Sequence, residues 1–264
     1  MGSQHATRVL VTTTTVLSTA ALLAGCAGGS TGSTSSPHAV KSAATASSAA
    51  SLASLPPAQI LSKALAAATA AGSMHFTVTG GSGAGQTTDV QNASSDAGNQ
   101  VIRNSHGTVT ARMVGGVGYF RASAGALARI LPGKPASQFA GRWIAAGPGD
   151  PGYADITEGL TLGSALAEFT PTGTLTSTGP QTVDGQAVIG VKGVAAASTG
   201  VPQGQPAILY VMATGLPLPV GYRAGVGSDR ELAAFSRWGE AVHPVAPAHP
   251  VPITSLMSSG PAVS

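Results

Sequence analysis

The stretch TVTARMVGGVGYFRAS, residues 108–123, predicts a β-hairpin whose two strands are joined at a Gly-Gly pair. Upstream, MHFTVTG at 74–80 alternates apolar and polar side chains, as a strand with one buried face does. A weak strand pattern lies between them at 86–94, and a better one follows at 100–105. Together these segments predict an antiparallel meander.

The second half of the chain returns to strand patterns after a helical interval. Short helices are predicted at 124–131 and 162–169, and the region 141–156 between them is predicted as a loop. Asp184-Gly185 is a strong hairpin signal farther along the chain. Strands are expected at 174–179, 181–193, 207–214 and 220–226, with one or two more within 230–247.

A first helix is predicted at 57–71, because Pro56 and Pro57 suit a helix start and Gly72 suits its end. The order of elements is then helix, meander, helices, meander. This order predicts an α+β fold built on one large antiparallel sheet. Since a sheet with an apolar face must bury it, the predicted helices are expected to cover that face.

The first 25 residues have the features of a bacterial lipoprotein signal peptide. Residues 9–23 are apolar and threonine-rich, shorter than the roughly 20 residues of a membrane span, and fit a signal-peptide core. They end in Leu23-Ala24-Gly25-Cys26, which looks like a lipobox, where the cysteine thiol is alkylated with diacylglycerol. Two or more acyl chains anchor a protein durably, since each buried methylene contributes about 0.8 kcal/mol. We therefore expect Cys26 to hold the chain at the extracytoplasmic face of the cell membrane.

Composition predicts a tether, a folded domain and a tail, and it excludes one class of partner. Residues 26–55 are rich in Ser, Ala and Gly and are predicted to form a flexible tether. The folded domain is expected at 56–252, followed by a disordered tail at 253–264. Net charge is only +3 and basic residues are spread singly, which excludes a nucleic-acid partner.

Catalytic and cofactor motifs are missing from the sequence. It contains no G-x-S-x-G, H-E-x-x-H or phosphate-loop pattern, so we predict neither an enzyme nor a bound cofactor. His243 and His249 lack a nearby Cys or carboxylate, which disfavours a metal site. Asp150, Asp155 and Glu158 are predicted as a solvated acidic loop, with a cation site as the less favoured alternative.

Two segments together resemble a known family. ILYVMATGLPLPVGYRAG at 208–225, followed by AAFSRWGEAVHPVAP at 233–247, resembles the C-terminal half of actinobacterial LppX/LprG-type lipoproteins, within the LolA-like group. The hairpin at 111–120 and Trp143 resemble matching parts of the N-terminal half. The resemblance implies a curved half β-barrel with helices over its concave face and an apolar cavity that holds lipid. This chain differs by placing Ala, Gly and Thr at many strand positions, which leaves either a roomy cavity or a thin core.

Two functions follow as expectations. The first is a lipoprotein that binds or carries a lipid or glycolipid, and the alternative is an envelope sensor or interaction protein with a solid core and a protein partner. The apolar strand faces are the expected cavity walls, with plain core packing as the alternative for each residue. These residues are Met74, Phe76, Val78, Met113, Tyr119, Leu209, Val211 and Phe235.

Replacing Cys26 tests the predicted anchor. We expect Cys26→Ala to leave the protein uncleaved or released from the membrane, because no thiol remains for lipid attachment. Fractionation of cells and mass spectrometry of the purified chain measure this outcome. Finding unlipidated Cys26 in membranes of the native host would contradict the prediction.

Overall fold

The computed structural model describes residues 52–81, 86–131, 136–196 and 200–258. The chain divides into two units, 1–38 and 39–264, and every described residue lies in the second. The predicted signal peptide, Cys26 and most of the tether therefore lie outside the described residues.

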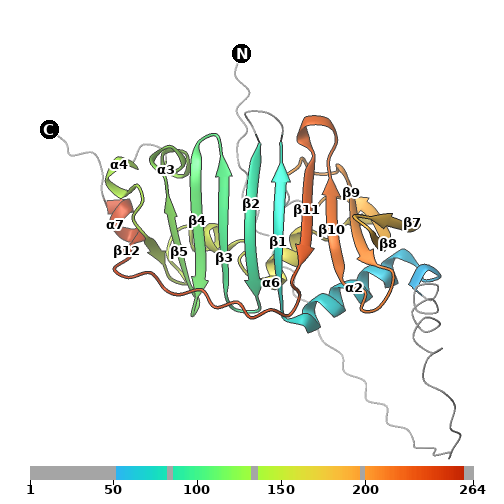
Figure 1. The fold of residues 1–264 in the computed structure, drawn as a ribbon. Helices are drawn as coiled ribbons and strands as arrows, with labels where there is room; N and C mark the ends of the chain where they lie inside the picture. Colours follow the sequence, from blue (N-terminus) through green and yellow to red (C-terminus); the bar gives the residue numbers. More distant parts are fainter. Residues whose placement is uncertain (1–51, 82–85, 132–135, 197–199, 259–264) are drawn as a thin grey trace, which may run out of the picture. The chain divides into compact units, whose positions relative to one another are not determined.

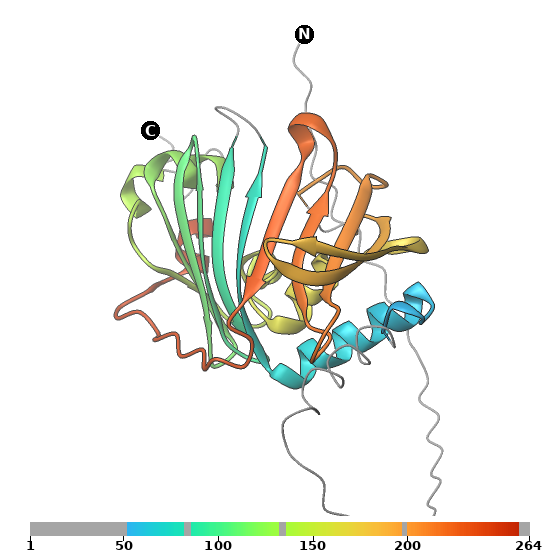
Figure 2. The same ribbon diagram turned by 45° about the vertical axis from the view of Figure 1, so that its right-hand side comes forward.

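The described strands form one twelve-stranded sheet that is twisted, curved and not closed into a barrel (Figures 1 and 2). Its order is β12-β6-β5-β4-β3-β2-β1-β11-β10-β9-β8-β7. Neighbours pair antiparallel except β12 and β6, which are parallel. This sheet with its helices confirms the predicted α+β fold. The strands are β1 Ser73–Gly80, β2 Thr87–Ser94, β3 Gly98–Asn104, β4 Gly107–Val114, β5 Val117–Ala122, β6 Ile144–Ala146, β7 Thr172–Val183, β8 Gln186–Val194, β9 Pro206–Met212, β10 Pro219–Ala224, β11 Glu231–Ser236 and β12 Val251–Pro252.

Helices and an extended segment lie on opposite faces of this sheet. In Figure 1, α6 lies behind the sheet and the chain at 237–250 crosses in front of it. We call these the inner and outer faces, and we call 237–250 the strap. No helix among the described residues is long and apolar enough to cross a membrane. The helices are α2 Pro57–Ala71, α3 Ala124–Ile130, α4 Ala136–Phe139, α5 Tyr153–Thr157, α6 Leu162–Glu168, α7 Ile253–Ser258 and the 3-10 turn η2 Gly227–Asp229.

The local signals at helix ends and turns are confirmed. Helix α2 spans the predicted 57–71 and ends at Gly72, whose φ of 79° is the left-handed conformation that glycine adopts without steric cost. The Gly-Gly pair between β4 and β5 has φ of 58° and 77°, and Asp184-Gly185 has 49° and 77°. Positive φ at both central residues is what a two-residue hairpin turn with the native strand twist requires.

Two separate hydrophobic clusters cover the inner face. The larger gathers residues of α2, α6 and strands β1, β2, β8, β9, β10 and β11, including Ile60, Phe76 and Leu209. The smaller gathers residues of β4 to β6 with α3 and α7, including Phe120 and Leu127. Strands β2 and β3 lie between them and place Asp89, Gln91 and Gln100 on the inner face, in register with Val78 and Phe76. A polar seam therefore separates the two clusters.

Small strand residues beside this seam allow the covering chain to approach the sheet closely. A Cβ added at Gly98 would collide with the backbone of Leu160, and one at Gly118 would lie 3.0 Å from Ile156. Gln91, which is 1% exposed, donates a hydrogen bond to the carbonyl oxygen of Gly159. In this part of the sheet, the small residues thus produce close packing of 156–160.

Three sequence expectations are corrected at the chain's irregular parts. The region 141–156 is not a plain loop, because it contains β6 and the start of α5. Residues 253–258 form α7 rather than a disordered tail, and Ile253 and Leu256 are 4% and 1% exposed. Leu52, assigned to the tether, is buried in the larger cluster. Of the one or two strands expected within 230–247, the structure has one, β11, and the strap that follows makes no strand until β12.

Two matched glycine substitutions test the close packing. We expect Gly98→Ala to lower the free energy of unfolding by about 1–3 kcal/mol, since the methyl group has no room beside Leu160. Gly163→Ala in α6 meets no atom within 4 Å and should be neutral or stabilising by up to about 1 kcal/mol. Urea unfolding of both variants measures the difference. Equal stability of the two variants would contradict the packing described here.

Candidate functional site

A cavity of about 370 Å³ opens at the polar seam of the inner face. Its apolar lining consists of Phe76, Val78, Ile102 and Phe169. Five carboxyl groups also line the cavity, and one of them, Asp89, lies on the sheet between Val78 and Ile102. No Lys, Arg or His is among the described residues that line the cavity. The carboxyl groups belong to Asp89, Asp155, Glu158, Glu168 and Glu231.

Three different elements bring Asp89, Glu168 and Glu231 together. Asp89 lies in β2 between Val78 of β1 and Ile102 of β3, so the alternation of the strand directs it to the inner face. Glu231 begins β11, whose buried positions recur at every second residue. Glu168 ends α6, a short helix that Thr161 and Ser164 start with a reciprocal capping box. The cavity therefore depends on tertiary packing and not on one motif.

Two of the buried carboxyl groups lack part of their hydrogen bonding among the described residues. Oδ2 of Asp89 accepts a hydrogen bond from Gln100 at 2.7 Å, but its buried Oδ1 has no partner. Glu231 is 7% exposed, and its Oε2 accepts from the backbone N–H of Gly200 at 3.2 Å. Its Oε1 is buried without a partner. Unpaired buried acceptors cost free energy that a bound donor can offset.

Burial is the largest cause of the raised pKa of three of these carboxyl groups. Burial, together with the smaller effects of the charges of Glu231, Asp89 and Glu158, raises the pKa of Glu168 to about 8. Burial also raises the pKa of Asp89 to about 6, against the opposing hydrogen bonds from Gln100 and the Val90 backbone. The pKa of Glu231 is raised by burial as well, against the Gly200 hydrogen bond. Near neutral pH, Glu168 is mainly protonated while Asp89 is mainly ionised.

The residues proposed from sequence as cavity walls are distributed among several places. Phe76 and Val78 line the cavity. Met74, Leu209, Val211 and Phe235 are buried in the larger cluster, and Met113 packs against the smaller one. Tyr119 pairs with Arg112 and lies on the outer face, in alternation with buried Phe120. The structure therefore brings two of the eight residues to this cavity.

Aromatic packing fills the inner face next to the cavity. The ring of Phe169 lies 5.4 Å from Phe76, 5.2 Å from Phe235 and 5.3 Å from Tyr222, measured between centroids. These edge-to-face contacts are typical of a packed core. They limit the open space to the carboxyl-lined side of Phe76 and Phe169.

The carboxyl groups of the cavity are candidate residues that were not predicted as a site from the sequence. Asp155 and Glu158 are exposed, as the predicted solvated loop requires, and both also line the cavity. Asp150 accepts a hydrogen bond from the Gly147 N–H at 2.8 Å. The sequence did indicate the inward position of Glu231, because it alternates in phase with Ala233 and Phe235, which are buried in β11. Asp89 and Glu168 carried no such signal, because their surroundings depend on strand pairing. Among the described residues, no three His, Cys, Asp or Glu side chains are arranged to hold a metal ion.

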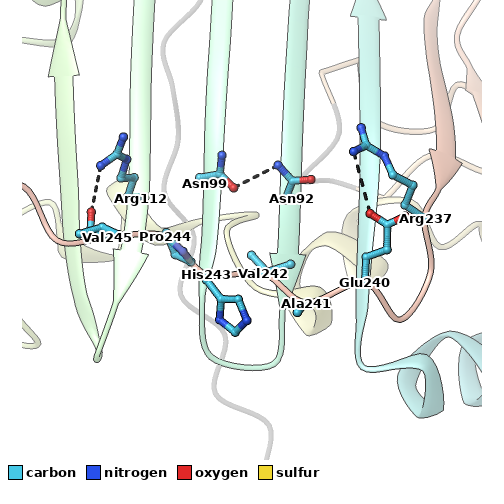
Figure 3. A pocket seen from close by; sticks show the side chains of 10 residues that line it. All are labelled: Asn92, Asn99, Arg112, Arg237, Glu240, Ala241, Val242, His243, Pro244 and Val245. Carbon is cyan, nitrogen blue, oxygen red and sulfur yellow. Dashed lines mark hydrogen bonds and ion pairs between the residues drawn. The ribbon is translucent and has the colours of Figure 1, made fainter.

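A second hollow of about 410 Å³ lies on the outer face under the strap (Figure 3). Arg112 donates to the carbonyl oxygen of Val245 at 2.9 Å, and Asn92 donates to Asn99 at 3.1 Å. Asn92 Oδ1 also lies 2.8 Å from Nδ1 of His75. These polar groups largely satisfy one another, and they hold the strap against the sheet.

Each of the two tryptophans interacts with neighbouring groups of the fold. Trp143 lies between two guanidinium groups, those of Arg112 and Arg121, at 4.8 and 5.0 Å from its ring centroid. Trp238 donates its ring N–H to the carbonyl oxygen of Pro219 at 3.1 Å and packs against Phe235. Neither lines the carboxyl cavity.

Comparison with solved structures finds two lipoproteins and a LolA superfamily protein at low sequence identity. LprF from Mycobacterium bovis superposes with a TM-score of 0.47 and 17% identity over 73% of this chain and 97% of its own. Lipoprotein LppX from Mycobacterium tuberculosis gives 0.45 and 18% over 70% and 98%. A LolA superfamily protein from Nitrosomonas europaea gives 0.30 and 11% over 72% and 96%. No family model and no curated protein matches the chain.

The raised pKa values predict how stability depends on pH. When a carboxyl group binds its proton more tightly in the folded state than in the unfolded state, the folded protein loses stability as pH rises from the ordinary pKa of the group to its folded pKa. For Glu168 this window runs from 4.5 to about 8. We therefore expect Glu168→Gln to raise Tm at pH 8.5, by about 2–4 °C for each kcal/mol recovered, and to leave Tm at pH 4 nearly unchanged.

Glu240→Gln is the matched control for this measurement. Glu240 is an exposed carboxylate whose side chain lies 4.0 Å from Arg237, away from the cavity. Thermal unfolding from pH 4 to 8.5 should show the same pH dependence in Glu240→Gln and in the unmodified chain. A Glu168→Gln variant with the unmodified dependence would show that burial of Glu168 does not control it.

Proposed function

We propose that this protein is a lipid-anchored lipoprotein of the cell envelope that binds one amphiphile in its inner-face cavity. The anchor is Cys26 in its lipobox, followed by a Ser-, Ala- and Gly-rich tether. The observation that carries the proposal is a cavity of about 370 Å³ lined by both apolar side chains and carboxyl groups. Ligand pockets measure about 300–1,000 Å³ and are lined mostly by apolar side chains, so the five carboxyl groups distinguish this cavity.

The lining offers contacts to both parts of an amphiphile. The half-buried Val78 and Ile102 offer surface for a hydrocarbon segment, and burial of apolar area contributes about 25 cal/mol per Å². Asp89 and Glu231 offer unpaired oxygens for a polar head. The volume is near the low end of the range for ligand pockets, so it suits one small amphiphile or the head region of a larger lipid.

A second candidate function is an envelope interaction or sensor protein. The observation that favours it is the aromatic cluster of Phe76, Phe169, Phe235 and Tyr222, which fills much of the inner face. In that case a protein partner would bind and no lipid would accompany the purified chain. Cross-linking in intact cells, followed by lipid extraction of the same sample, separates the two functions.

Filling the cavity tests the first function. We expect Val78→Phe to reduce the amount of co-purified amphiphile at least tenfold, because the added ring fills space at the apolar lining. Leu232→Phe is the control, since it adds the same ring at a position that is already 40% exposed and outside this cavity. Native mass spectrometry of both variants measures bound ligand. Equal loading of the two variants, or an empty unmodified chain, would contradict the proposal.

A further inference from the structure

The cavity contains an imbalance of charge that its own residues do not compensate. Three of its carboxyl groups converge from different elements: Asp89 from β2, Glu168 from α6 and Glu231 from β11. Asp155 and Glu158 add two more at the rim, where both are exposed. None of the described lining residues is cationic, so ionised carboxylates there have no counter-charge.

An independent observation shows that a donor is missing. The side chain of Glu231 is 93% buried, because only 7% of it is exposed, and it lines the cavity. Its Oε1 and Oδ1 of Asp89 are buried acceptors without hydrogen-bond partners among the described residues. In folded proteins such groups are normally paired, so the two oxygens mark positions for donors of a ligand.

The donors and the charge that these oxygens require narrow the class of ligand. An ammonium group carries three N–H donors and one positive charge, which matches the unpaired oxygens and the uncompensated carboxylates together. The described residues hold no cluster suited to a metal ion.

From this arrangement we propose that the cavity recognises the primary ammonium head of an amphiphile, with Asp89, Glu168 and Glu231 as its partners. The inference rests on the proposed function, because it assigns the polar head of the ligand that the same cavity binds. The hydrocarbon beside the ammonium group lies against Val78 and Ile102. Oxygens of Asp89 and Glu231 accept the N–H bonds.

Binding of such a head is coupled to proton release. An ammonium ion favours the ionised form of nearby carboxyl groups, and Glu168, whose pKa is about 8, is mainly protonated when the cavity is empty at pH 7. Affinity should therefore increase between pH 6 and pH 8, by up to about tenfold per pH unit for each proton released. A neutral amphiphile produces no such increase.

The test uses the full chain carrying Cys26→Ala, so that no attached lipid competes. Isothermal titration with dodecylamine, dodecyltrimethylammonium, dodecanol and dodecanoate is carried out at pH 6, 7 and 8, in buffers of different ionisation enthalpy.

We expect dodecylamine to bind at least tenfold more tightly than the other three at pH 8, with proton release. Equal binding of dodecanol or dodecanoate would overturn the ammonium assignment while supporting an amphiphile site. Equal binding of dodecyltrimethylammonium would overturn the role of N–H donors.

Further outcomes separate failure of this inference from failure of the proposed function. If none of the four amphiphiles binds, both are overturned. If calcium chloride alone displaces dodecylamine at millimolar concentration, the site is a metal site and the inference fails. Glu231→Gln and Asp89→Asn should each weaken dodecylamine binding at least tenfold without changing dodecanol binding, and Glu240→Gln should change neither. The ligand comparison on the unmodified cavity remains decisive if a variant does not fold.

Discussion

The hydrogen bond that Gln91 donates to the carbonyl oxygen of Gly159 is the contact on which the site depends. It is made in the interior by an amide that is 1% exposed, where leaving either group unpaired would be costly. The bond holds the chain at 156–160 against β2 and β3. Gly98 makes this approach possible, because any larger residue would meet the backbone of Leu160. The position of α6, and with it Glu168, follows from this contact.

The same contact explains why the interior is divided. A single apolar core across all twelve strands would have no place for a charged group. Here the inner face carries two hydrophobic clusters, and a seam of Asp89, Gln91 and Gln100 lies between them. Gln91 serves packing, while Asp89 and Gln100 face the cavity. The seam therefore combines a structural hydrogen bond with the polar half of a binding site.

Carboxyl groups of raised pKa line the inner-face cavity. Burial works against their ionisation, and neighbouring carboxylates increase that effect at Glu168. Such a cavity is most stable when protonated or when a cation is present. Its preference for ligands then depends on charge as well as on apolar area, in contrast to a cavity lined by hydrocarbon alone.

Local sequence signals located most of the fold. The helix at 57–71 and the turns at Asp184-Gly185 and between β4 and β5 were predicted correctly, because proline, glycine and alternating side chains act within a few residues. Signals failed where distant contacts decide the structure. Residues 253–258 look like a frayed end, yet they form a helix because Ile253 and Leu256 are buried against β6 and the smaller cluster.

The cavity is a clearer example of the difference between what local sequence signals predict and what distant contacts decide. The sequence by itself predicted a lipobox at Cys26, located most strands of the sheet and carried the phase that turns Phe76, Val78 and Glu231 inward. Only the tertiary structure decided that Asp89, Glu168 and Glu231 meet, since they come from three elements spread over more than half of the folded chain. Alternation assigns a residue to a face of its own strand, but which faces meet depends on strand pairing and on the close approach of 156–160 to Gly98.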